Sequence, residues 1–252
     1  MSDLTSRMTA ETLGRLERIS ATAEQGGLDA AVDLLVRCVE DDGVVQAFGT
    51  GHSQAFAMEI AGRAGGLIPT ARISLGDLVV RGGQSPDVLT SAAELERDPS
   101  VVDALWQITD PAPADVFVIA SNSGVNGSIV GYALKAKEEG HAVIAVTSLE
   151  HTRRVEPKHP SGKRLSEIAD VVIDNLAPYG DATLDLGDGV LVGSVSSVTA
   201  AFIGQLLTIR TVERLAASGS RPPVYLSANI PGGDEHNHHL ESRYGSRLRR
   251  SS

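Results

Sequence analysis

Short apolar runs alternate with longer segments of helical periodicity along most of the chain. The runs are rich in β-branched residues, which is typical of strands buried on both faces of a sheet. They are Val44–Phe48, Leu67–Ser74, Val116–Ala120, Ala142–Val146 and Asp170–Ile173. Strands that alternate with helices pair in parallel through right-handed crossovers. The pattern therefore predicts an α/β fold, a three-layer α/β/α sandwich around a mainly parallel sheet.

The same periodicity divides the chain into three parts. Two helices separated by Gly26-Gly27 are predicted before the first strand, and a long helix is predicted over 187–217. The residues from Pro222 onward form a polar tail in which histidines gather. We expect N-terminal helices packed on the core (1–43), a central domain (44–217) and a C-terminal tail that completes the site (218–252).

Two connections are harder to interpret. The segment 75–112 is longer than a strand-to-helix linker and contains a short predicted helix, Ala92–Arg97. Long ordered insertions over a site often act as lids. The segment Glu150–Lys163 is basic and interrupted by proline, so we expect an exposed loop there, and its histidines are too irregularly spaced to predict a metal site.

The first strand leads into the glycine turn Gly49-Thr50-Gly51-His52-Ser53. Glycine takes tight-turn angles without steric cost, and Ser53 is a good N-cap for a helix predicted to reach Ala64. A strand, a glycine turn and a helix N-terminus together aim N–H groups at an anion. We therefore expect Gly51, His52 and Ser53 to contact a phosphate. A nucleotide-binding dehydrogenase is a weaker alternative, because Gln54 occupies the third glycine position of the dinucleotide motif.

A second polar turn follows the strand Val116–Ala120. It contains Ser121, Asn122, Ser123 and Asn126, whose small hydroxyl and amide groups can hydrogen-bond phosphate oxygens. Such residues also occur as ordinary caps and turns. Because the carboxyl ends of parallel strands meet at one edge, the two turns together predict one shared crevice.

These two motifs resemble those of the sugar isomerase (SIS) domain family, whose members bind phosphosugars on a flavodoxin-like α/β fold. The resemblance runs from about Asp29 to Leu215, and the segment Gly232-Gly233-Asp234-Glu235-His236-Asn237 is similar to a bacterial branch of the family. It implies that the second turn holds the phosphate of a sugar 6-phosphate. It also implies a homodimer or a dimer of dimers, with no cofactor and no metal.

The resemblance also points to a catalytic base. SIS isomerases carry a glutamate on the helix after the first strand, which indicates Glu59 here; the alternative is a surface ion pair between Glu59 and Arg63. Glu94 or Glu96 is expected to be a second acid or base. The alternative for either residue is a solvated surface charge.

Two further residues are expected in the site. By the same resemblance His236, from a neighbouring subunit, is expected to open the sugar ring, and a solvated polar tail is the alternative. Ser197, early in the last long helix, is expected to line the pocket or to allow close packing.

The composition and net charge limit the kinds of partner and compartment that we expect for this protein. The net charge of −10 opposes non-specific nucleic-acid binding, and the single cysteine, Cys38, fits a reducing compartment. Without an N-terminal signal pattern or a long apolar run, we expect no membrane association and a cytoplasmic protein. The sequence thus predicts an enzyme that abstracts a proton next to the carbonyl of an aldose or N-acetylamino-sugar 6-phosphate, with isomerisation or loss of water as the outcome. A non-catalytic phosphosugar-sensing module is the alternative.

Overall fold

The computed structural model describes residues 3–249. At its centre lies a sheet of five strands, all parallel, in the order β2-β1-β3-β4-β5. The strands are β1 (Val45–Gly49), β2 (Thr70–Ile73), β3 (Val116–Ala120), β4 (Ala142–Thr147) and β5 (Val171–Asp174). Each predicted apolar run supplies one strand, so the α/β prediction is confirmed.

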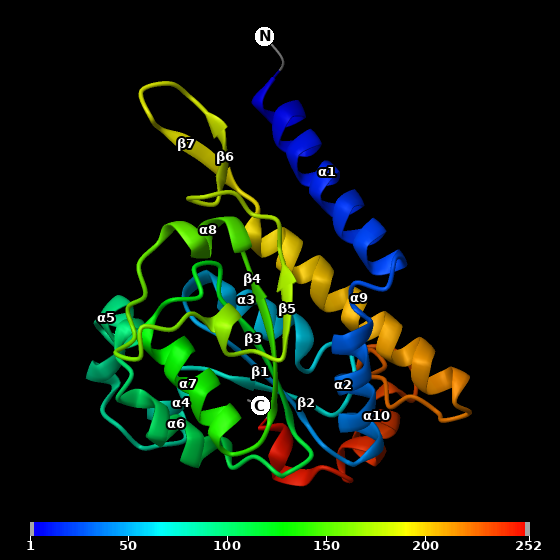
Figure 1. The fold of residues 1–252 in the computed structure, drawn as a ribbon. Coiled ribbons are helices and arrows are strands. Elements are labelled where there is room, and N and C mark those ends of the chain that lie inside the picture. The colour runs from blue at the N-terminus through cyan, green and yellow to red at the C-terminus, as the bar shows by residue number, and fades with distance from the viewer. Residues whose placement is uncertain (1–2, 250–252) are drawn as a thin grey trace.

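Helices cover both faces of this sheet (Figure 1). One face carries α1 (Leu4–Glu24), α2 (Asp29–Glu40), α3 (Gln54–Ile60) and α9 (Ser196–Ala217). The other face carries α4 (Asp77–Val80), α6 (Val101–Thr109) and α7 (Gly127–Glu138). Successive side chains of a strand point to opposite faces, so Val118 joins the first core while Phe117 and Ile119 join the second. The three-layer α/β/α sandwich is confirmed.

The predicted helix over 187–217 is wrong in its first part. An antiparallel hairpin of β6 (Ala182–Asp185) and β7 (Leu191–Ser194) precedes α9. The turn of this hairpin contains Gly187, Asp188 and Gly189, all with positive φ, and such residues end a right-handed helix. In Figure 1 the hairpin stands beyond the sheet, next to α1.

The insertion after β2 is mostly helical. Besides α4 and α6 it holds η2 (Pro86–Leu89) and α5 (Ala92–Arg97). The bounds of α5 are those that the sequence predicts. The helix packs against α7 and against η1 (Gly51–Ser53), the single 3-10 turn that follows β1. The insertion therefore reaches the end of the first strand.

Two other segments differ from the predictions in length. Helix α3 ends at Ile60 rather than Ala64, because Ala61 is extended and Gly62 has a φ of 75°. The expected loop at 150–163 begins as helix α8 (Leu149–Arg154), which Ser148 caps by accepting a hydrogen bond from the His151 N–H at 3.0 Å. Within residues 3–249, none of the helices is both long and apolar enough to cross a bilayer.

The C-terminal tail is folded rather than solvated. It forms α10 (Gly233–Glu241) and η4 (Gly245–Leu248), and η4 packs beside the edge strand β2. Its buried side chains Tyr225, Tyr244 and Leu248 join Val44, Ile68 and Ala71 in a small core of their own. In Figure 1 the tail lies at the end of the sheet opposite to α8 and the hairpin.

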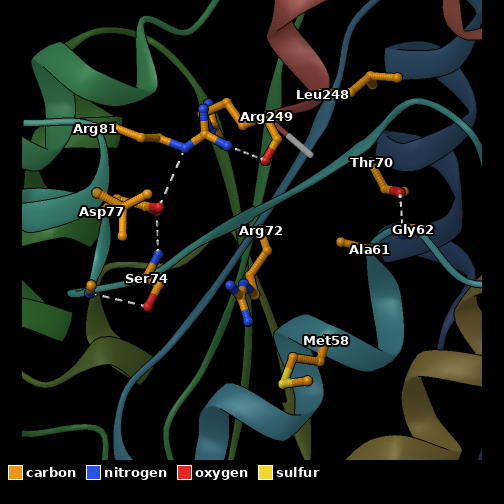
Figure 2. A pocket seen from close by; sticks show the side chains of 12 residues that line it. Met58, Ala61, Gly62, Thr70, Arg72, Ser74, Asp77, Arg81, Leu248 and Arg249 are labelled. Carbon is orange, nitrogen blue, oxygen red and sulfur yellow. Dashed lines mark hydrogen bonds and ion pairs between the residues drawn. The ribbon is translucent and has the colours of Figure 1, made fainter. Parts of the chain in front are cut away.

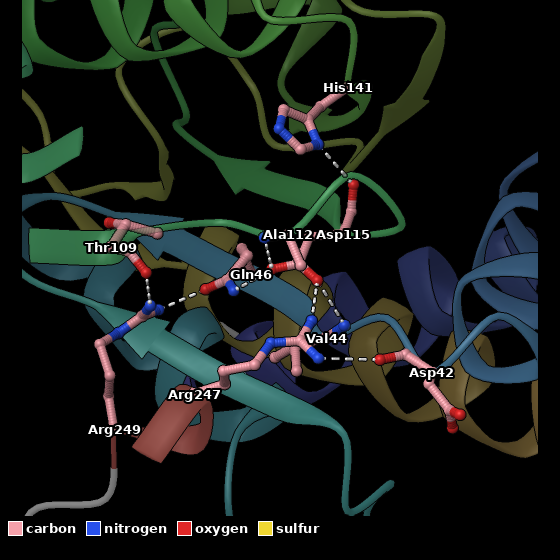
Figure 3. A network of polar contacts seen from close by, with 9 residues as sticks. All are labelled: Asp42, Val44, Gln46, Thr109, Ala112, Asp115, His141, Arg247 and Arg249. Carbon is pink, nitrogen blue, oxygen red and sulfur yellow. Dashed lines mark hydrogen bonds and ion pairs between the residues drawn. The ribbon is translucent and has the colours of Figure 1, made fainter. Parts of the chain in front are cut away.

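Polar contacts attach the end of this tail to the sheet (Figure 3). The Asp115 carboxylate, whose side chain is 0% exposed, accepts hydrogen bonds from the Arg247 guanidinium, the Gln46 amide and two backbone N–H groups. Arg249 donates to the Thr109 carbonyl at 2.7 Å and to the side-chain carbonyl of Gln46. Asp115 directly precedes β3, so this network lies at the amino ends of the strands.

Candidate functional site

The two predicted turns lie side by side at the carboxyl ends of the strands. β1 and β3 are neighbours in the sheet, with Gly49 opposite Ala120, so the chain leaves both strands at the same level. Between the turns lies a hollow of about 310 Å³, which we call the carboxyl-end hollow. Its wall is formed by Thr50, Gly51, His52, Ser53, Glu96, Ser121, Asn122, Ser123, His151, Asp181, Ser194, Ser196 and Ser197.

The first turn has a different local structure from the prediction. Ser53 is the N-cap residue of α3, as predicted, but it lies in the helical region and its side chain makes no capping hydrogen bond. The hydroxyl of Ser53 therefore stays available to a ligand in the hollow. Gly51 has a φ of 54°, and a Cβ at this position would lie 3.3 Å from Oε2 of Glu96. The positive φ favours glycine at this position, and a side chain there would also crowd the Glu96 carboxylate.

The second turn is held by its own backbone and by neighbouring strands. Ser121 Oγ accepts a hydrogen bond from the Gly124 N–H at 3.1 Å, and the Ser121 N–H donates to Val146 O at 3.0 Å. Asn122 is fixed through Oδ1, which accepts from the Asn175 amide at 3.1 Å. The turn is therefore ordered while Ser123 lines the hollow.

Glu96 links the two turns. Its Oε1 accepts hydrogen bonds from Thr50 Oγ1 at 2.8 Å and from Asn126 Nδ2 at 2.7 Å. Its backbone carbonyl accepts a hydrogen bond from Ser128 Oγ at 2.6 Å, which ties α5 to the start of α7. For Oε2 the structure gives no hydrogen-bond partner within residues 3–249. One carboxylate oxygen is thus fixed by both turns, and the other has no partner while Glu96 lines the hollow.

Asn126 occupies an unusual position. It precedes α7 without capping it through its side chain, and its amide points to Glu96 instead of lining the hollow. Its Oδ1 is buried and has no hydrogen-bond partner among the described residues. The sequence predicts that Asn126 contacts the phosphate, whereas in the structure its amide donates a hydrogen bond to the Glu96 carboxylate.

The other candidate acids lie elsewhere. Glu59 is absent from the wall of the carboxyl-end hollow. It forms an ion pair with Arg63 and accepts a hydrogen bond from the Gln205 amide at 2.6 Å. Glu94 is exposed and also lines no part of the hollow. Within one chain, Glu96 is the predicted acid that meets the two turns.

His236 lies far from this hollow in the same chain. It belongs to α10, and its Nε2 is 3.0 Å from the Val224 carbonyl oxygen. Because the tail packs at the other end of the sheet, it does not complete the site of its own chain (Figure 1). Ser197, in contrast, lines the hollow from the first turn of α9, as predicted.

Asp181 and His151 also line the wall, and neither was predicted from the sequence. Asp181 accepts hydrogen bonds from the Ser196 N–H at 2.8 Å and the Ser196 hydroxyl at 2.7 Å, and so fixes the start of α9. His151 projects from α8, which follows the fourth strand. Its position was the available signal, because His151 lies in the first turn of the helix that follows β4, near the carboxyl end of that strand, where ligands of parallel sheets bind.

A second hollow, of about 380 Å³, lies at the outer edge of the sheet (Figure 2). It is lined from β2 by Arg72 and from neighbouring segments by Met58, Arg81 and Arg249. Arg81 and Arg249 are engaged in the fold, since Arg81 pairs with Asp77 at 3.5 Å and donates to the Arg249 carbonyl at 2.6 Å. This β2-edge hollow contains neither of the glycine and serine turns.

Comparison with known proteins agrees with this arrangement. The SIS domain family matches residues 9–148. A UPF0309 protein of Listeria monocytogenes is 37% identical over 220 residues, which cover 86% of this chain and 88% of the relative. A UPF0309 protein of Caldanaerobacter subterraneus is 33% identical over 242 residues, which cover 95% of this chain and 96% of the relative.

Solved structures share the fold at low sequence identity. A phosphoheptose isomerase from Francisella tularensis has a TM-score of 0.53 at 15% identity, over 84% of this chain and 97% of that chain. A ligand-bound protein of Escherichia coli CFT073 has a TM-score of 0.50 at 16% identity, over 84% of this chain and 90% of that one. The family match and the bacterial relatives place the chain in the SIS domain family, among the UPF0309 proteins.

Proposed function

We propose that the protein is an enzyme acting on an aldose or N-acetylamino-sugar 6-phosphate. The main support for this proposal is that the two polar turns and Glu96 line one hollow of about 310 Å³. Backbone N–H groups and small hydroxyls suit phosphate oxygens, while a carboxylate nearby can take a proton from carbon. The volume also falls within the range of small-ligand sites.

In this proposal the phosphate binds to the turn from Ser121 to Ser123, with Gly51, His52, Ser53 and Ser197 around it. Ser121 Oγ accepts a hydrogen bond from the Gly124 N–H, and its own proton has no acceptor among residues 3–249, so it can be donated to a phosphate oxygen. The phosphate then lies between the starts of α7 and α3. The sugar carbons extend from it toward Glu96.

Glu96 is the proposed base. Its Oε2 removes a proton from the carbon next to the carbonyl of the open-chain sugar, and the electrons of that C–H bond form an enediol or an enol. Return of the proton to the neighbouring carbon gives the ketose, and expulsion of a β-hydroxyl gives loss of water. The two outcomes share their first step, so the site supports isomerisation and dehydration equally.

The experiment is incubation with hexose, heptose and N-acetylamino-sugar 6-phosphates in heavy water, followed by mass spectrometry and NMR. Deuterium should enter at the carbon next to the carbonyl for at least one sugar. A new isomer then identifies an isomerase, and loss of water identifies a dehydratase. Tight binding with no exchange for any sugar would contradict an enzyme and favour a phosphosugar-sensing module.

We further propose that the protein is a homodimer. The hairpin β6–β7 exposes Leu186, Val190, Leu191 and Val192, of which the first two are 51% and 53% exposed. A two-stranded hairpin is marginally stable alone in water, so a second copy covering these side chains would stabilise it. Leu191→Asp should then lower the sedimentation coefficient from that of a dimer to that of a monomer. A monomeric wild-type protein would contradict the proposal.

A role of His236 in a neighbouring site needs a further contact between copies through the tail, which lies at the end of the sheet opposite to the hairpin (Figure 1). His236→Gln keeps a donor for the Val224 carbonyl but cannot transfer protons as imidazole does. If His236 acts in the partner's site, mixing His236→Gln chains with Glu96→Gln chains should restore part of the activity, because one site of the mixed dimer has both groups. Full activity of His236→Gln alone would exclude this role.

A further inference from the structure

The ring of His151 has a defined protonation pattern. Its Nδ1 is 3.1 Å from the backbone nitrogen of Gly180. A backbone N–H can only donate a hydrogen bond, so Nδ1 must offer its lone pair. A neutral ring that accepts at Nδ1 carries its proton on Nε2. The geometry therefore fixes the tautomer in which Nε2–H is the donor.

The Nε2–H group is free to serve a ligand. His151 lines the carboxyl-end hollow, and the structure gives Nε2 no hydrogen-bond partner within the described part of the chain. The ring is held in place by Tyr179, with ring centroids 5.3 Å apart, as well as by Gly180. The ring is thus held in place at the hollow while its Nε2–H remains without a partner among the described residues.

The carboxylates near the His151 ring favour its charged form less than burial favours its neutral form. Burial lowers the pKa of His151, and the carboxylates of Asp181 and Glu150 raise it by smaller amounts. The Glu150 carboxylate is itself paired with Arg154 at 3.3 Å, and the Arg154 guanidinium lies over Tyr179. The ring is therefore neutral near pH 7, like the catalytic imidazoles that polarise carbonyl groups without being charged.

We propose that His151 is the electrophile of this site: its Nε2–H donates a hydrogen bond to the carbonyl oxygen of the sugar while Glu96 removes the neighbouring proton. The proposal rests on the proposed function. In the step, the C–H electrons move to the C–C bond and the carbonyl π electrons move to oxygen. The Glu96 carboxylate gains the proton, and His151 stabilises the negative oxygen without losing its own proton. α8 and α5 thus supply a donor and an acceptor to one ligand.

Two substitutions separate the two ring nitrogens. The amide of His151→Asn reaches the position of Nδ1 and can still accept from Gly180, but it has no group at Nε2. The amide of His151→Gln reaches the position of Nε2 and can donate there. With glucose 6-phosphate and N-acetylglucosamine 6-phosphate as probes, His151→Asn should slow deuterium exchange by about 10²–10³-fold, the usual cost of one lost oxyanion donor. His151→Gln should recover a large part of that rate, and neither change should alter the midpoint of thermal unfolding much.

Exchange by His151→Asn at the wild-type rate would overturn the inference while leaving the proposed function intact. If the wild-type protein exchanges deuterium into neither sugar phosphate, the proposed function fails for these two sugars. The tautomer of His151 then tests the inference independently. In 15N-labelled full-length protein at pH 7, two-bond proton–nitrogen correlations should show an Nε2–H ring for His151. A protonated ring or an Nδ1–H ring would overturn the inference in either case.

Discussion

Two carboxylates at opposite ends of the sheet use their oxygens in different ways. At the amino end, the buried Asp115 carboxylate accepts four hydrogen bonds, so both of its oxygens are occupied within the chain. At the carboxyl end, Glu96 uses one oxygen, while its Oε2 and the His151 Nε2 have no partner in residues 3–249. The first arrangement holds the tail in place, and the second leaves donors and acceptors for a ligand.

Whether both oxygens of a carboxylate have partners within the chain distinguishes a structural role from a functional one better than the charge of that carboxylate does. Both carboxylates lie next to a strand end, and both join segments that are distant in the sequence. Asp115 is buried and both of its oxygens have partners, as is normal for buried polar groups, whereas Glu96 is only half-buried and has one oxygen without a partner among residues 3–249. We expect substitutions at the amino end to change stability and substitutions at the carboxyl end to change chemistry.

The largest expected effect concerns the two glutamates proposed as bases. Glu96→Gln preserves size but cannot accept a proton, so exchange with solvent deuterium should fall by about 10²–10⁴-fold, the usual contribution of a general base. Glu59→Gln is the matched control and should exchange at the wild-type rate, because Glu59 lies in an ion pair outside the hollow. The reverse result, with exchange lost only in Glu59→Gln, would restore Glu59 as the base and contradict the placement of Glu96.

The next effect is on stability at the amino end. Asp115→Ala removes the buried acceptor of Arg247 and Gln46 and should lower the free energy of unfolding by about 3–5 kcal/mol, as for other broken buried pairs. Asp42→Asn is the control, since Asp42 pairs with Arg243 through exposed side chains and asparagine tolerates its φ of 57°, and about 0–1 kcal/mol is expected. Urea unfolding measures both. Equal losses would show that the network does not fix the tail.

A smaller effect is expected for phosphate binding. Ser123→Ala removes one hydrogen bond to a charged group, which is worth about 1.5–3 kcal/mol, so the Kd for a sugar phosphate should rise about 10- to 100-fold. Ser74→Ala, in the β2-edge hollow, is the control and should leave the Kd unchanged. Calorimetric titration compares the two. An effect of Ser74→Ala alone would move the ligand to the other hollow.

The smallest effect is the pH dependence of stability that His151 and His159 contribute. Burial lowers the pKa of both from the ordinary value of 6.5. Below that value the unfolded chain binds more protons than the folded chain, so stability should decrease as the pH falls from 6.5 toward the lowered pKa values. Unfolding of the wild type and of His151→Asn between pH 7.5 and 5 should show a shallower slope for the variant. An unchanged slope would mean that His151 does not titrate with folding.

The strands and the two turns could be predicted because their signals are local. β-branched runs and glycine or serine turns determine backbone structure within a few residues, as in Val116–Ala120 and its turn. The identity of the base could not be predicted in this way. Glu94 and Glu96 are two residues apart on α5, and only packing of that helix against Gly51 and Asn126 distinguishes them. The position of the tail and the role of His151 depend equally on contacts between distant segments.

The central claim is that the carboxyl-end hollow, and not the β2-edge hollow, binds the sugar phosphate. Backbone amide spectra of 15N-labelled protein, recorded during titration with the sugar 6-phosphates of the exchange experiment, test it directly. We predict the largest shifts at residues 51–53 and 121–126, with a further change at His151. Shifts concentrated at Arg72, Ser74, Gly76 and Arg249, with the two turns unaffected, would contradict the account.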